Sequence, residues 1–115
     1  MTKRRFVFGT VKTGLLALDR DSLEVAWKGR VGESMAAFAP YSKPPQHCVG
    51  TAPFLMPDGS VCASSADGAI HFWEEASGRH QSEIRTGAPY FAAPTLARGR
   101  LYAADASGRL RVFAV

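Results

Sequence analysis

Short apolar stretches separated by glycine-containing turns recur along the chain. Stretches of four to seven residues rich in Val, Leu, Phe, Tyr and Trp are followed by Asp-Gly or Ser-Gly pairs, at 67–68, 77–78 and 107–108. β-Branched and aromatic residues favour strands, and Gly in these pairs supplies the positive φ of a tight hairpin turn. The pattern predicts four strands in the middle of the chain, near 52–56, 60–64, 69–74 and 80–85, and no long helix.

The predicted strands belong to an internal repeat. Residues 61–73 align without a gap on 101–113, a shift of 40, and a more diverged copy at 15–27 is shifted by 55. A unit of four antiparallel strands repeated about every 40 residues is typical of the blades of a β-propeller. We therefore predict an all-β single domain of about two and a half four-stranded antiparallel blades. The blade copies are expected at 6–32, 51–87 and 91–115.

Two of the copies resemble a known repeat. Residues 68–78 and, more closely, 15–27 with Trp27 at the end are similar to the repeat of pyrroloquinoline-quinone-like (PQQ-like) β-propellers, and 86–94 resembles the linker and first strand of that repeat. A WD40 blade is the rival, because 57–68 followed by Phe72-Trp73 looks like one. No Gly-His pair opens any copy, however, and Trp27 suits the PQQ-like repeat, which is the interpretation we favour.

The strand count predicts incomplete ends. The first copy begins at its second strand and the last stops after its third, which leaves ten strands, too few to close a propeller ring. Unpaired strand edges are templates for pairing with another chain. We expect contact through 6–8 and 110–113, either in a homo-oligomer or with other propeller blades; a further protein partner is possible.

The spacing of 55 residues between the first two copies places an inserted loop at about 33–49. It would lie at the rim of a propeller, where ligand and partner contacts concentrate. The candidate contact residues are Tyr41, Lys43 and His47, and the alternative is a loop without a binding role.

Charge and composition exclude several classes of function. The net charge is +4 and the isoelectric point about 9.4, but the basic residues are spread along the chain and not interleaved with aromatic residues, so we expect no nucleic-acid binding. No apolar stretch is long enough to span a membrane. No secretory signal is recognisable, which predicts a cytoplasmic protein unless the chain was cut from a longer exported one.

Catalytic chemistry finds little support. The PQQ-like resemblance implies a quinone-dependent dehydrogenase as the enzyme hypothesis, which would need an acidic base beside calcium and commonly two adjacent cysteines; Cys48 and Cys62 are far apart. No serine has a Gly-x-Ser-x-Gly setting. His47-Cys48 and the pair His71 and His80, which could meet across a hairpin, are weak metal candidates without a third ligand. We favour a surface histidine pair.

These observations predict no enzyme, no bound cofactor and no metal. The expected function is that of a non-catalytic propeller segment acting as an interaction or assembly scaffold, by self-association or as the C-terminal part of a larger propeller. The alternative is a fragment of a cofactor-binding propeller, of the quinone-dependent dehydrogenase type or attached to an adenylating enzyme. Trp27 and Trp73 are expected to pack between blades.

Overall fold

The part of the chain described by a computed structural model, residues 4–35 and 45–115, contains ten β-strands and no helix. The described residues include no helix long and apolar enough to cross a membrane. The strands are β1 (Arg5–Gly9), β2 (Leu15–Asp19), β3 (Val25–Gly29), β4 (Phe54–Leu55), β5 (Ser60–Ser64), β6 (Ala69–Glu74), β7 (His80–Arg85), β8 (Thr95–Ala97), β9 (Arg100–Ala104) and β10 (Leu110–Ala114).

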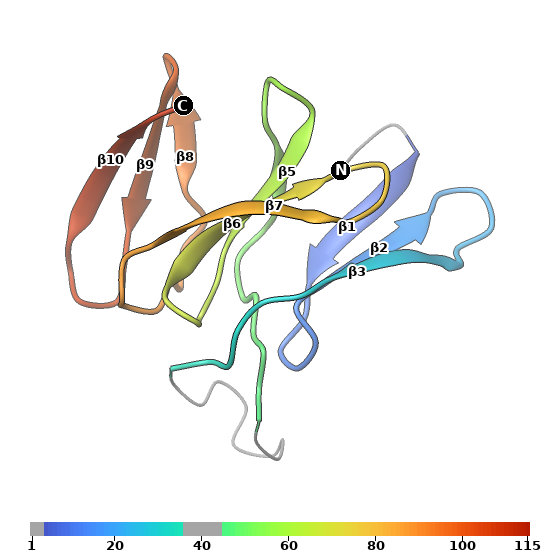
Figure 1. Ribbon diagram of the computed structural model, residues 1–115, viewed down its shortest axis with the longest axis horizontal. Helices are drawn as coiled ribbons and strands as arrows, with labels where there is room; N and C mark the ends of the chain where they lie inside the picture. Colours follow the sequence, from blue (N-terminus) through green and yellow to red (C-terminus); the bar gives the residue numbers. More distant parts are fainter. Residues whose placement is uncertain (1–3, 36–44) are drawn as a thin grey trace.

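The strands form three antiparallel sheets in chain order, side by side (Figure 1). The first sheet is β1-β2-β3, the middle sheet is β4-β5-β6-β7, and the third sheet is β8-β9-β10. The predicted all-β fold of two and a half blades is confirmed. The strand expected at 52–56 is shorter, because Pro53 and Pro57, which have no N–H to donate, flank β4.

Tight turns and β-bulges set the register of the hairpins. Gly68, Gly78 and Gly108 have φ of +90°, +74° and +86°, as the turn pairs predicted. The β2–β3 register shifts between Ala17 and Leu18, and the β6–β7 register shifts at the equivalent place between Phe72 and Trp73. Because side chains alternate with period two, the extra residue moves everything beyond it to the other face.

Two apolar cores lie between the sheets. The first joins Leu15, Ala17 and Trp27 of the first sheet to Val61, Ala63 and Trp73 of the middle sheet. The second joins Cys62 and Ile70 of the middle sheet to Leu101 and Ala103 of the third. Strand β5 is therefore buried on both faces, as a strand in the middle of a stack of blades must be.

The two tryptophans pack between sheets, as predicted. Trp27 is 7% exposed, and its ring lies against the turn that joins β6 to β7, where a Cβ on Gly78 would come within 2.4 Å of it. Trp73 is fully buried, and its indole approaches Gly29 of the first sheet.

Candidate functional site

The third sheet leaves open the face that corresponds to a core face in the middle sheet. The shift of 40 residues puts Leu110 at the position of Ile70 and Val112 at the position of Phe72. Ile70 is 0% exposed in the second core, whereas Leu110 is 68% and Val112 48% exposed. A face of this kind is where the next blade of a stack would pack.

The first sheet has an apolar face on its opposite side. Phe8 lies opposite Leu16, and Leu18 lies opposite Val25, so that these side chains share the face turned away from the first core. Phe8 and Val25 are 40% and 53% exposed. The described sheets thus form a stack with an apolar face at each end.

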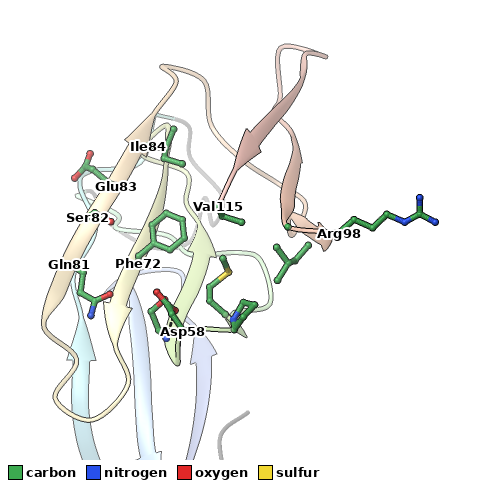
Figure 2. Close-up of a pocket in the computed structure, with 13 residues that line it drawn as sticks. Asp58, Phe72, Gln81, Ser82, Glu83, Ile84, Arg98 and Val115 are labelled. Carbon is green, nitrogen blue, oxygen red and sulfur yellow. Dashed lines mark hydrogen bonds between the residues drawn. The ribbon is translucent and has the colours of Figure 1, made fainter.

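A cleft of about 780 Å³ separates the middle sheet from the outer part of the third. Phe72 and Ile84 point into it from β6 and β7, and Val115 lies across from them (Figure 2). The remaining lining includes Leu96 of β8 and Ser82 of β7.

The register explains why this cleft is open. Ala17 pairs with Trp27 in the first sheet, and the equivalent pair in the middle sheet is Phe72 with Ser82. A serine therefore stands where the first sheet has its large tryptophan. In the first interface the β6–β7 turn also covers Trp27. The third sheet offers Ser82 no equivalent turn among the described residues, because β10 is its outermost described strand.

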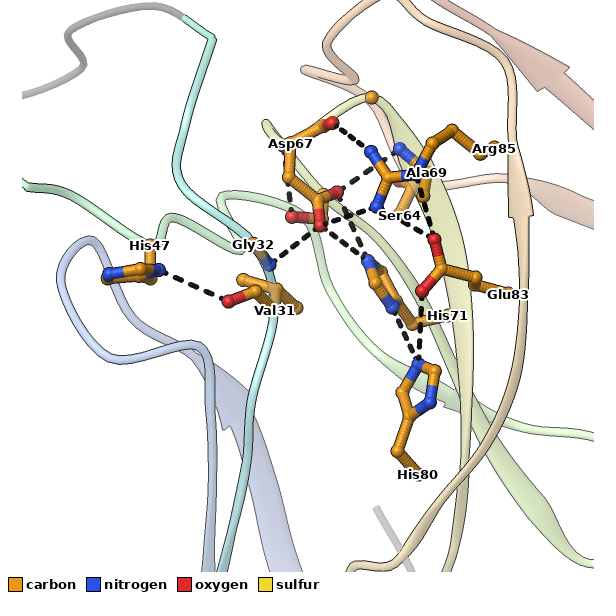
Figure 3. A network of polar contacts seen from close by, with 12 residues as sticks. Val31, Gly32, His47, Ser64, Asp67, Ala69, His71, His80, Glu83 and Arg85 are labelled. Atoms are coloured by element: carbon orange, nitrogen blue, oxygen red, sulfur yellow. Dashed lines mark hydrogen bonds and ion pairs between the residues drawn. The ribbon is translucent and has the colours of Figure 1, made fainter.

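A buried polar network occupies the other face of β6 (Figure 3). Both carboxylate oxygens of Asp67 lie near His71 Nε2, at 3.1 and 2.9 Å, and the side chain of each residue is 2% exposed. Asp67 also accepts hydrogen bonds from the backbone N–H of Gly32, at 2.8 Å, and of Ala69, at 3.1 Å. Because Gly32 follows the first sheet, the network connects the first and middle sheets.

The bulge in β7 brings His80 into this network. His71 lies opposite Glu83, and Trp73 lies opposite His80, with Gln81 as the extra residue. His71 Nδ1 is 2.9 Å from His80 Nε2, and His80 Nε2 is 3.9 Å from Glu83 Oε1. With regular pairing in place of the bulge, His80 would lie opposite Glu74 and point to the face of Phe72.

The network fixes the charge of its members. Burial would raise the pKa of Asp67, but hydrogen bonding to His71, the charge of His71 and the N–H of Gly32 bring that pKa down to about 2. Burial, followed by the charge of His71, lowers the pKa of His80. Asp67 is therefore ionised, and His80 is neutral at physiological pH.

The sequence predictions for this region hold in part. The predicted meeting of His71 and His80 across a hairpin is confirmed, but the expectation of a surface pair is wrong for His71, which is buried because Trp73 stacks on its ring, with centroids 5.4 Å apart. Sequence reasoning missed Asp67 and Glu83 as members. The sequence spacing of 67, 71, 80 and 83 places these residues on one face of the sheet only when the bulge in β7 is taken into account.

Of the three candidate contact residues in the inserted loop, the structure describes only His47. Tyr41 and Lys43 are outside the described residues. His47 Nδ1 is 3.1 Å from the carbonyl oxygen of Val31, and its backbone bonds to Lys12 and Gly14. Its partner role remains a prediction.

The two cysteines are free and buried. Burial raises the pKa of the Cys62 thiol to about 12 and also raises that of Cys48. Both therefore remain protonated thiols at neutral pH, and neither is poised as a nucleophile or as a thiolate ligand.

Three stacked antiparallel sheets, of which the middle one is a complete four-stranded blade, define a segment of a β-propeller. Among solved structures, the chain is similar to the crystal structure of BamB from Moraxella catarrhalis, with a TM-score of 0.67 and 20% sequence identity. The match covers 100% of this chain and 30% of that chain, so this chain spans less than a third of the length of the BamB chain. No protein-family model and no curated protein sequence matches the chain. The likeness concerns the fold.

Proposed function

We propose that this chain is a non-catalytic propeller segment that acts as an assembly scaffold by stacking against further blades. The observation that carries the proposal is the exposure of Leu110 at the position where Ile70 is completely buried. Exposed apolar faces at the ends of a repeat stack are costly in water, and stacking of a further repeat removes them.

The two end faces suit each other. The third sheet offers Leu110 and Val112, and the first sheet offers Phe8 and Val25 on the side turned away from the middle sheet. A contact between these unlike faces is head-to-tail, like the contact between successive blades of one propeller. The partner is therefore a further blade, supplied by a second copy of the chain or by other sequence of a larger propeller.

A charge placed on either end face tests whether that face is needed for association in solution. We expect light scattering of the 115-residue chain to give oligomers whose mass rises with concentration. Val112→Lys removes the face of the third sheet and Val25→Lys removes that of the first sheet. Each variant alone should be monomeric, because a head-to-tail contact needs both faces.

A mixture of the two variants gives the decisive result. Each retains the face that the other has lost, so an equimolar mixture should form a heterodimer and nothing larger. The control is Leu23→Lys, which adds the same charge at an exposed apolar residue in a turn and should leave association unchanged. A concentration-independent monomer, or variants that associate as the parent does, would show that copies do not stack in this way.

A further inference from the structure

We propose that His71, His80 and Glu83 form a three-ligand site for a divalent metal ion with a preference for nitrogen donors, Zn²⁺ above all. One ligand atom of each residue lies within 4.8 Å of the others. Two imidazoles and one carboxylate form a donor set that is typical of zinc sites with an open position. From the sequence, the two histidines have no recognisable third ligand. In the structure the register of β6 and β7 places Glu83 opposite His71, as the third ligand.

The distances suit zinc after a small adjustment. His71 Nδ1 and His80 Nε2 are 2.9 Å apart. Two nitrogens bound to one tetrahedral zinc at ~2.0–2.1 Å are about 3.3 Å apart. The pair therefore has to open by a few tenths of an ångström. His80 and Glu83 have side chains that are 38% and 35% exposed, which leaves room for this adjustment. Arg85 holds Glu83 Oε2 through an ion pair of 2.7 Å, so the oxygen that remains for the metal is Oε1, which faces His80.

Asp67 orients the buried ligand. Its carboxylate accepts a hydrogen bond from His71 Nε2–H, and when the His71 ring is neutral this leaves Nδ1 as the unprotonated nitrogen facing His80. A carboxylate behind a metal-binding histidine fixes the tautomer and makes the free nitrogen a better donor. Asp67 is itself held by the Gly32 and Ala69 N–H groups, so the ligand is already positioned before metal binds.

To bind a metal through Nε2, the neutral ring of His80 must carry its proton on Nδ1. His71 Nδ1 and His80 Nε2 are 2.9 Å apart, and because His71 Nε2–H donates to Asp67, a neutral pair carries the shared proton on His80 Nε2. Binding requires the proton to move to His80 Nδ1, at a partly exposed ring, which is a tautomer change.

The ligand set is particular to the middle sheet. At the equivalent register positions the first sheet has Leu16, Val25 and Lys28, none of which is a suitable ligand. The third sheet has Arg111 at the position of His71. The first sheet has the same bulge as the middle sheet, so the blade fold does not require the two histidines and the glutamate.

Three protein ligands leave one coordination position for water or for a donor from another molecule. That position faces the surface, where His80 and Glu83 are partly exposed, while Trp73 covers the buried side of His71. Nitrogen donors disfavour Mg²⁺ and Ca²⁺, which prefer oxygen ligands. We therefore expect Zn²⁺ and Co²⁺ to bind and Mg²⁺ not to bind.

Calorimetric titration of the tag-free chain with zinc chloride tests the site. We expect one Zn²⁺ per chain, with the affinity lowered at least tenfold by His80→Ala and by Glu83→Gln. Both side chains are partly exposed, and circular dichroism will show that both variants fold. The control is His47→Ala, which removes the one histidine outside the cluster and should leave the affinity unchanged.

Cobalt provides a second, independent measurement. Tetrahedral Co²⁺ bound by His71, His80 and Glu83 should give intense visible absorption bands that zinc removes, and these bands should be absent in His80→Ala. No zinc binding at micromolar concentration, or equal zinc affinity in His80→Ala, Glu83→Gln and the parent, would overturn the proposal. Loss of binding in His47→Ala alone would also overturn it.

Discussion

The indole Nε1 of Trp27 donates a hydrogen bond of 2.8 Å to the backbone carbonyl of Glu75, across the interface between the first and middle sheets. Glu75 lies in the turn between β6 and β7, so the outer strand of the first sheet is fixed to the hairpin of the middle sheet. Arg5 Nη1 adds an ion pair to Glu75 Oε1 at 3.1 Å. One turn therefore receives contacts from both edge strands of the first sheet.

Replacing Trp27 by alanine should destabilise the fold strongly. The side chain is almost completely buried in the first core, and loss of a buried tryptophan costs about 3–5 kcal/mol in unfolding free energy. Chemical denaturation measures this loss. Trp27→Phe, which keeps an aromatic ring but not the hydrogen bond, should lose clearly less. A change in Trp27→Ala within ~0.5 kcal/mol would mean that this interface does not form.

A side chain at Gly78 should be poorly tolerated for two separate reasons. Its φ of +74° is unfavourable for other residues, and a Cβ there would lie 2.4 Å from the Trp27 ring. Gly78→Ala should therefore cost more than the ~1 kcal/mol that an unfavourable backbone conformation typically costs.

Gly108 separates the two causes. It has a similar φ of +86°, but no atom lies within 4 Å of a Cβ built there. Gly108→Ala therefore measures only the free-energy cost of the unfavourable backbone conformation. The two variants should differ clearly in denaturant midpoint, with Gly78→Ala the less stable. Equal midpoints would show that the Trp27 ring does not press on this turn.

The repeat made most of the fold predictable. Hairpin turns depend on local sequence, so Gly68, Gly78 and Gly108 were identified from the residues before them, and three of the four strands predicted in the middle sheet have the expected bounds. The strand at 52–56 was overestimated because apolar composition outweighed the prolines on either side. The blade order follows from the repeat.

The polar network was less predictable because it depends on register. Alternation alone puts His80 on the opposite face from Glu83, and only the extra residue at Gln81 reverses it. In the sequence Asp67 has the pattern of an ordinary turn residue, which is the local role that Asp105 has with Ser107. Its burial depends on Gly32, which is 35 residues away in the chain.

Stability should fall in two steps as the pH is lowered. His80 has a folded pKa below 6.5, so the unfolded chain binds more protons there just below pH 6.5, and stability decreases as pH falls through that window until the folded pKa is passed. Asp67 has a folded pKa of about 2 against 3.8 for the free group, so its contribution is present above pH 3.8 and is lost between 3.8 and 2.

Urea denaturation at a series of pH values measures both steps. Asp67 contributes roughly 2 kcal/mol to the lower step, since one pKa unit is about 1.4 kcal/mol. Other carboxyl groups whose pKa values are lowered by hydrogen bonds add to the same step: Asp19, Asp58, Glu74 and Asp105. His80→Ala should remove the upper step and keep the lower one. A parent profile that is flat between pH 7 and 5 would contradict the placement of His80 against His71.

Filling the cleft beside the third sheet should stabilise the chain. Ser82 occupies the register position of Trp27, and its neighbours across the cleft include Leu96 and Val115. A tryptophan there would cover these apolar side chains and lie beside Phe72 on the paired strand, and aromatic cross-strand pairs are favourable. We expect Ser82→Trp to raise the unfolding free energy by about 1 kcal/mol or more, since a largely buried aromatic side chain contributes 1.5–3 kcal/mol.

Ser22→Trp is the matched control, because Ser22 lies in the exposed β2–β3 turn, away from the cleft. It should leave the unfolding free energy within ~0.5 kcal/mol of that of the parent. Fluorescence distinguishes the two positions as well: the added indole should emit at shorter wavelength in Ser82→Trp than in Ser22→Trp, because only the former lies against apolar side chains. If Ser82→Trp is destabilised, or if both added indoles emit as solvent-exposed tryptophan, the cleft is not the counterpart of the space that Trp27 fills.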